Sequence, residues 1–158
     1  MRLKSLYAAS VLLVAAFIVT GSGNYQSCAP ITAKQLREMA TQLGYEVKDI
    51  VTDVGKEKFS VTLTREGLDI PVAAELSGNL KFVWLTVNLG NVQPENAARH
   101  LAMLKQNSII QPCQFYFTEQ GRQMMGLPVE NRGINNAFLR DRLENIAGRV
   151  GETKAMWQ

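Results

Sequence analysis

Histidine and carboxylate side chains are the groups of this chain that could perform acid–base or nucleophilic chemistry, and they are sparsely placed. His100 is the only histidine among the 158 residues, so a histidine-based triad or zinc site would depend on it. It falls within a predicted helix, where an exposed or hydrogen-bonded histidine is a simpler interpretation than a catalytic base. Asp69 and Glu75 lie on one predicted strand at a separation of roughly 20 Å, too far apart for a glycosidase pair.

The chain also has no glycine-rich phosphate loop, serine-nucleophile elbow or zinc-protease motif. We therefore expect a non-enzymatic protein with no catalytic residue, no cofactor and no metal site. The alternative is a small enzyme of unrecognised class that uses His100 or a surface carboxylate.

Cys28 and Cys113 are the two cysteines, and their wide separation lacks the paired spacing of zinc ligands. In an oxidising compartment they could form a disulfide that adds roughly 4 kcal/mol of stability if its geometry is unstrained. The other reading is a buried Cys113 thiol and a free Cys28. Sequence supplies no bridge geometry, so both readings stay open.

The compartment is indicated by residues 1–23, which have the layout of a bacterial export signal. Arg2 and Lys4 precede an apolar run from Leu6 to Val19. This run of 14 residues is shorter than the roughly 20 that a membrane-spanning helix needs. We therefore expect an exported protein in the periplasm or outside the cell.

Small residues end the export segment and indicate where it is cut. Gly21 and Gly23 satisfy the small-x-small pattern, which favours cleavage before Asn24. One alternative is an uncleaved segment that anchors the protein in the membrane. Another is lipid attachment at Cys28.

Loss of residues 1–23 changes the charge of the domain that remains. The whole chain has a formal net charge of +3 from 17 basic and 14 acidic residues. Because Arg2 and Lys4 leave with the signal, the rest is nearly neutral. A neutral domain gives no electrostatic reason to expect nucleic acid as a partner. We expect a protein partner in the cell envelope, with membrane contact only through an uncleaved signal.

Hydrophobic periodicity predicts one α+β domain over residues 32–150, between a leader at 24–31 and a tail at 151–158. Thr32 and Gln35 form a capping box ahead of a helix with apolar residues at helical spacing. Gly44 suits the left-handed position that ends such a helix. The predicted order is helix, three strands, helix, two strands and helix, which is typical of an antiparallel sheet packed by helices.

Three runs of alternating residues predict the first strands, at 59–64, 69–76 and 82–89. Pro71 has no N–H and indicates an edge or a bulge in the second strand. A helix follows Pro94, with its apolar side formed by Ala97, Leu101 and Leu104. Two more strands are expected at 113–118 and 122–127. The last helix begins near Asn135 or Asn136, with an apolar stripe of Leu139, Leu143, Ile146 and Val150.

Two large rings lie on the more polar side of the third predicted strand, where Phe82 and Trp84 alternate with apolar residues and share a face with Thr86 and Asn88. If helices cover only the other face, these rings would be exposed and would mark a protein-contact face. The second helix must pack against something, so its covering of the rings is the competing expectation.

Three strings resemble the YbjN-type family of bacterial sensory transduction regulators. They are Leu43-Gly44-Tyr45, the run 68–72 and the run 84–90, and the resemblance covers about residues 32–150. It implies a fold similar to the type III secretion chaperones, small α+β proteins that often dimerise and bind extended segments of other proteins.

The resemblance implies a binding or regulatory module, with a homodimer as one state, and it supplies no catalytic residue. A structural envelope factor without a discrete ligand site is a further alternative. Export departs from the cytoplasmic setting of such chaperones.

Overall fold

The computed structural model of the protein describes residues 29–158. The predicted export signal, residues 1–23, and Cys28 lie outside the described residues. No helix within 29–158 is long and apolar enough to cross a membrane. The elements along the chain are α1 (Ala33–Gln42), β1 (Lys48–Val51), β2 (Lys58–Arg65), β3 (Leu68–Leu76), β4 (Phe82–Asn91), the 3-10 turn η1 (Pro94–Asn96), α2 (Ala97–Gln106), β5 (Gln114–Phe117), β6 (Arg122–Glu130), α3 (Asn136–Glu152) and α4 (Lys154–Trp157).

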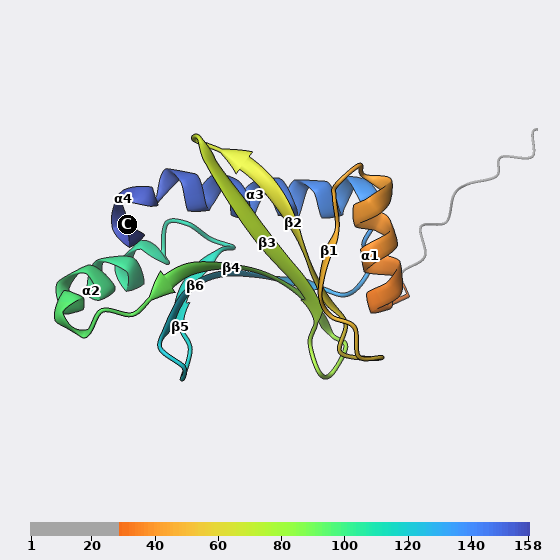
Figure 1. Ribbon diagram of the computed structural model, residues 1–158, viewed down its shortest axis with the longest axis horizontal. Helices are drawn as coiled ribbons and strands as arrows, with labels where there is room; N and C mark the ends of the chain where they lie inside the picture. The colour runs from red at the N-terminus through yellow and green to blue at the C-terminus, as the bar shows by residue number, and fades with distance from the viewer. Residues whose placement is uncertain (1–28) are drawn as a thin grey trace, which may run out of the picture.

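Six strands form one antiparallel sheet in the order β1-β2-β3-β4-β6-β5, so β6 inserts between β4 and β5. The sheet is strongly twisted, and α3 runs along one side of it (Figure 1). This arrangement confirms the α+β class and the helix–strand order expected from the sequence. β1 is an addition: three of its four residues are exposed, so it lacks the alternation that reveals a half-buried strand.

The first helix forms as its sequence predicts. The Thr32 hydroxyl accepts from the Gln35 amide at 3.2 Å, and the Gln35 side chain accepts from the Thr32 amide at 2.8 Å. This capping box satisfies amides that the first turn cannot pair internally. Gly44 ends the helix with a φ of +87°, a conformation that glycine adopts without a Cβ penalty.

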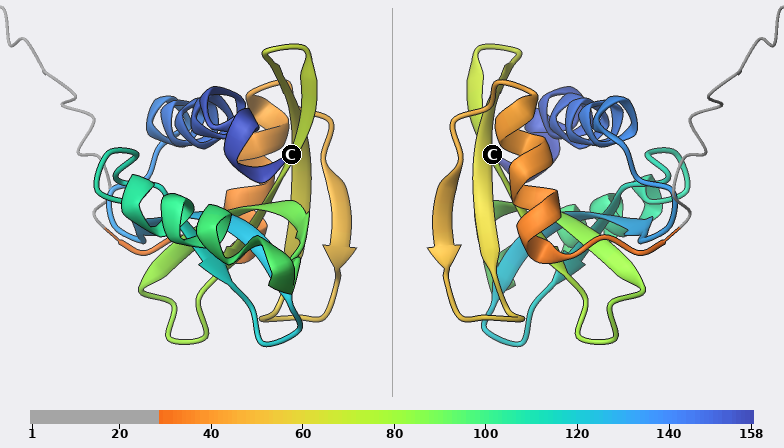
Figure 2. Two further views of the ribbon diagram at one scale, coloured as in Figure 1. Left: turned by 90° about the vertical axis from the view of Figure 1, so that its left-hand side faces the viewer. Right: turned by 90° about the vertical axis from the view of Figure 1, so that its right-hand side faces the viewer.

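The core lies between α1, α3 and one face of the sheet. α3 contacts β2, β3, β4 and β6, and Figure 2 shows the helices gathered on one side of the strands. The alternating apolar residues of the strands point toward the helices, and the apolar stripes of α1 and α3 face the sheet. The fully buried side chains include Leu36, Val61, Val72, Val83, Leu85, Leu127, Leu143, Ile146 and Val150.

The second helix buries a different face from the one predicted. Met103 is fully buried, whereas Leu101 and Leu104 are 53% and 51% exposed. α2 packs on β5 and α4, where the His100 ring meets Phe117 edge-on with centroids 4.9 Å apart. Helical spacing alone did not identify the buried side of this helix, because the elements that it packs against decide which side is covered.

Pro71 lies at a free edge, as its missing N–H predicts. β2 pairs with β3 along its whole length, but β4 pairs only with Ala73–Leu76. The half of β3 that contains Pro71 therefore has no neighbour on its other side. A residue without an N–H costs no ladder hydrogen bond there.

The chain beyond residue 150 is part of the fold. The segment expected as a tail completes α3 and forms α4. The Trp157 indole donates to the Val150 carbonyl at 3.0 Å, and its ring packs against the core. β6 likewise continues to Glu130, past the predicted end at Leu127.

Candidate functional site

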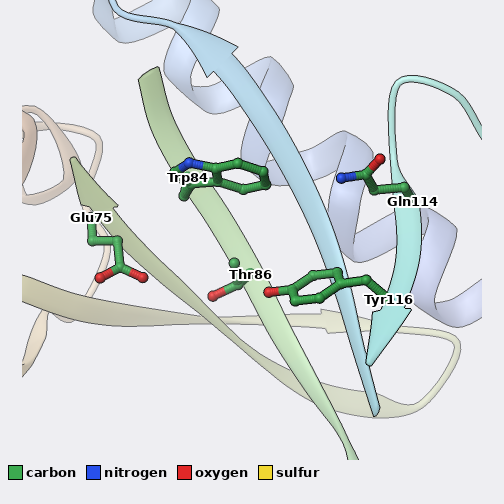
Figure 3. A pocket seen from close by; sticks show the side chains of 5 residues that line it. All are labelled: Glu75, Trp84, Thr86, Gln114 and Tyr116. Atoms are coloured by element: carbon green, nitrogen blue, oxygen red, sulfur yellow. The ribbon is translucent and has the colours of Figure 1, made fainter. Parts of the chain in front are cut away.

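The sheet face opposite the helices carries an open hollow of about 410 Å³. Its lining comes from three strands: Glu75 from β3, Trp84 and Thr86 from β4, and Gln114 and Tyr116 from β5. Figure 3 shows these side chains rising from one side of the sheet. β4 alternates here, because Val83 and Leu85 are buried against the helices while Trp84 is half-buried in the hollow.

Gly126 of β6 forms the floor between the two rings. A Cβ at this position would lie 2.9 Å from Tyr116 Cε1 and 3.6 Å from Trp84 Cζ3. The register explains this geometry, since Gly126 pairs with Thr86 on one side and with Gln114 on the other. Trp84 and Tyr116 thus approach the glycine from its two neighbouring strands, and any larger residue would push the phenol ring away.

Glu75 supplies the charge at one end of the hollow. One carboxylate oxygen lies 2.8 Å from Lys58 Nζ across the β2–β3 pair. The pKa of Tyr116 is raised, first by burial and then by the negative charge of Glu75. The negative charge of Glu75 therefore disfavours ionisation of the Tyr116 hydroxyl, which couples the two side chains electrostatically.

The polar atoms of the two rings are unused within the fold. Among residues 29–158, neither the Trp84 indole N–H nor the Tyr116 hydroxyl forms a hydrogen bond to another side chain or to the backbone. Such groups are usually paired when a ring is buried. Both residues line the hollow, so their unpaired polar groups are available to a bound molecule.

A second hollow of about 310 Å³ lies beside the first and shares Thr86 with it. Its lining is more polar and extends across the sheet toward β1. It is formed by Ile50, Lys58, Ser60, Pro71, Ala73, Thr86, Asn88 and Met124. The ion pair between Lys58 and Glu75 joins the two hollows into one surface, which we call the open face.

The structure divides the predicted contact residues. Trp84 and Thr86 line the first hollow and Asn88 the second. Phe82, 39% exposed, lies in a different depression with Lys81, Glu130 and Arg132 among its neighbours. The competing expectation, that the second helix covers the rings, does not hold, since α2 packs on β5 and α4 instead.

Sequence reasoning missed Gln114, Tyr116 and Gly126. Alternation along residues 113–118 places Gln114 and Tyr116 opposite buried Phe115, so a surface position could have been inferred. That these residues face Trp84 depends on the insertion of β6 between β4 and β5, which is a tertiary property.

The two sheet edges differ in their capacity to pair with another strand. At β5 the Asn107 side chain accepts from the Phe115 amide at 2.7 Å and donates to the Phe115 carbonyl at 3.1 Å. These backbone groups would otherwise be free at the edge. β1 forms the other edge, where it pairs only with β2 in the described part of the chain.

The remaining reactive groups do not form a site. Within residues 29–158 no three His, Cys, Asp or Glu side chains are grouped as metal ligands. His100 packs against Phe117, away from the open face.

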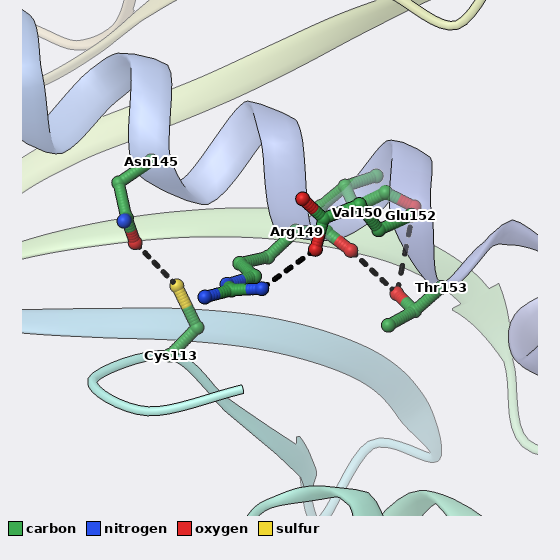
Figure 4. Close-up of polar contacts among 6 residues, drawn as sticks. All are labelled: Cys113, Asn145, Arg149, Val150, Glu152 and Thr153. Carbon is green, nitrogen blue, oxygen red and sulfur yellow. Dashed lines mark hydrogen bonds and ion pairs between the residues drawn. The ribbon is translucent and has the colours of Figure 1, made fainter. Parts of the chain in front are cut away.

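Cys113 is a buried free thiol whose Sγ lies 3.4 Å from Asn145 Oδ1 under α3 (Figure 4). Burial raises its pKa to about 11, against the opposing effect of Arg149 and Arg142. Its predicted partner Cys28 lies outside the described residues, so the disulfide stays a prediction.

The chain was also compared with known proteins. No family model matches it. No curated protein matches it either.

Proposed function

We propose that this domain is a non-enzymatic binding module that engages a partner protein of the cell envelope through its open face. One observation carries the proposal: Trp84 and Tyr116 converge over Gly126 on a sheet face that no described helix covers. A glycine with two aromatic neighbours makes a rigid, partly apolar surface with unused polar atoms.

The energetics of such a surface favour protein recognition. Tryptophan and tyrosine dominate interface hot spots because they bury a large area with little loss of conformational freedom. The rings are held by neighbouring strands, so little ordering is needed on binding. The polar atoms around them provide the directional contacts that give specificity.

The mode of contact follows from the edges. Addition of a partner strand at β5 would have to displace the two Asn107 hydrogen bonds. Of the two outer strands, β1 is therefore the one that strand addition favours, and it lies next to the second hollow. A partner segment that pairs with β1 could extend over the open face toward Trp84.

Placement in the envelope rests on residues 1–23, whose charge and apolar run are those of an export signal. The resemblance to YbjN-type regulators, with their chaperone-like fold, is part of the same proposal. The resemblance favours a binding or regulatory role over catalysis.

The test is photo-crosslinking in the native envelope, with the crosslinking amino acid placed at Gln114. We expect one partner to be captured, and Trp84→Ala to lower its recovery about tenfold or more, the loss typical of a hot-spot aromatic. Leu101→Ala is the matched control, because this exposed residue lies on α2. Thermal unfolding of each variant shows whether the fold is retained. Unchanged recovery with folded Trp84→Ala would remove the open face as the partner site.

A further inference from the structure

We infer that the first hollow of the open face receives a cationic side chain, an arginine of the bound partner, between the aromatic rings and Glu75. That this arginine belongs to a partner protein rests on the proposed function. The preference of the hollow for a cation rests separately on the positions of Glu75 and the two aromatic rings.

Glu75 provides the anionic end of the site. One of its oxygens is engaged by Lys58 at 2.8 Å, and within residues 29–158 its Oε2 has no hydrogen-bond donor. Lys58 reaches the carboxylate from β2 and belongs to the lining of the second hollow. Lys58 is not among the residues that line the first hollow, so Glu75 is the one charged residue of that lining and keeps Oε2 as an acceptor.

The aromatic rings provide the second half of the site. The faces of indole and phenol carry negative electrostatic potential and attract a cation placed within about 6 Å of the ring centre. Trp84 and Tyr116 come from opposite sides of Gly126. The hydroxyl of Tyr116 points toward Thr86, on the side of the hollow nearer Glu75 (Figure 3).

The other lining groups fit the same ligand. The hydroxyls of Thr86 and Tyr116 and the amide oxygen of Gln114 can all accept hydrogen bonds. An anionic ligand would be repelled by Glu75. A purely apolar one would strip water from the carboxylate without a compensating contact.

Arginine fits better than lysine because of its shape. The guanidinium is planar, stacks on aromatic faces and presents several donors at once to a carboxylate and nearby oxygens. Lysine offers a compact ammonium that keeps its water more strongly. We therefore expect the order of affinity arginine, lysine, neutral isostere.

The experiment uses the full ¹⁵N-labelled chain and follows its indole N–H signals. Trp84 and Trp157 are the two tryptophans, and the Trp157 indole is bound to the Val150 carbonyl. It thus serves as an internal reference. The probes are the capped tripeptides Gly-Arg-Gly, Gly-Lys-Gly and Gly-citrulline-Gly, since citrulline keeps the shape of arginine without its charge.

We expect the arginine peptide to shift the Trp84 signal saturably, with an affinity about fivefold higher than that of the citrulline peptide, as an exposed cation–π contact predicts. Trp157 should not move. Glu75→Gln should abolish the preference for arginine, whereas Glu95→Gln, at an exposed site in η1, should leave it unchanged.

Equal affinity for the arginine and citrulline peptides would overturn the inference, without any need for a variant. A Trp84 shift with N-acetylglucosamine trimer and none with the arginine peptide would overturn it in favour of a carbohydrate site. Failure of the proposed function gives a different result: loss of arginine preference with Trp84-dependent partner capture intact refutes only the cationic ligand. The reverse pattern refutes only the protein partner.

Discussion

Tyr116 lies against Gly126, and the ring occupies the space that a side chain at Gly126 would need. The ring atom Cε1 would lie 2.9 Å from a Cβ there, closer than real Cβ contacts allow. Tyr116 pairs with Met124 and Gly126 with Gln114, so the ring leans diagonally across the β5–β6 pair. Glycine is required here by a neighbour's ring and not by a positive φ. The glycine and the hollow above it are thus one feature.

Replacement of Gly126 tests this relationship. Gly126→Ala should lower the free energy of unfolding by about 1–3 kcal/mol, because the added methyl group forces Tyr116 from its place. Chemical denaturation measures the change. Gly148→Ala is the control: this helix position has nothing within 4 Å of its Cβ, so alanine should raise stability by about 0.5–1 kcal/mol. Equal stability of Gly126→Ala and the native protein would show that the ring does not depend on the glycine.

The closure of the β5 edge by Asn107 is a second testable feature. Asn107→Ala removes both hydrogen bonds to Phe115, and we expect unfolding free energy to fall by about 1–3 kcal/mol. The freed backbone groups should also promote self-association, detectable by analytical ultracentrifugation over a range of concentrations. Asn91→Ala, at the exposed end of β4, should change neither quantity. A monomeric Asn107→Ala protein of native stability would show that Asn107 does not protect the β5 edge from pairing.

The orientation of α2 can be checked by comparing two apolar residues of that helix. Met103→Ala should cost about 2–5 kcal/mol, because it leaves a cavity in a fully buried position. Leu101→Ala should change stability by about 0.5 kcal/mol or less, since half of its side chain is in water. Thermal or urea unfolding distinguishes them. Similar losses in the two variants would mean that the helix is rotated relative to this structure.

The Cys113 thiol predicts a pH dependence of stability. Its pKa is raised by burial from the ordinary 9.0 to about 11, so the folded state holds the proton more tightly than the unfolded chain. Its contribution is fully present below pH 9 and is lost as the pH rises from about 9 to 11, by at most about 1.4 kcal/mol per pH unit.

Other groups titrate in the same range, so the measurement is a difference between variants. Unfolding free energies of Cys28→Ser and Cys28→Ser/Cys113→Ala should converge between pH 9 and pH 11, as the thiol loses its advantage. A difference that does not vary with pH would contradict the burial of a protonated thiol. In the native chain, intact mass under non-reducing conditions separately tests the predicted Cys28–Cys113 bridge.

Local patterns in the sequence were sufficient where each element buries one face. Alternation fixed the inward side of β4, so Val83 and Leu85 are buried and Trp84 is not. The capping box at Thr32 and the stripe from Leu139 to Val150 defined the starts and faces of α1 and α3. In these elements the period of the apolar residues has a single solution.

Periodicity failed to predict which side of α2 is buried, and it failed to predict β1, which has no alternation of apolar and polar residues. Apolar spacing along α2 predicted a buried Leu101, and the burial of Met103 instead depends on β5 and α4, against which the helix packs. β1 is short and exposed, so no alternation reveals it. Strand propensity and hydrophobic periodicity are weak guides for such edge elements, because contacts with neighbouring elements determine whether they form.

By itself the sequence determined the α+β class, the core faces of the main strands and helices, and Trp84 on a sheet face away from the core. Only the tertiary structure decided that this face stays open and that Tyr116, Gly126 and Glu75 gather around Trp84. The physical reason is strand order. Periodicity describes each strand separately, whereas the insertion of β6 between β4 and β5 places residues more than 30 positions apart in one hollow.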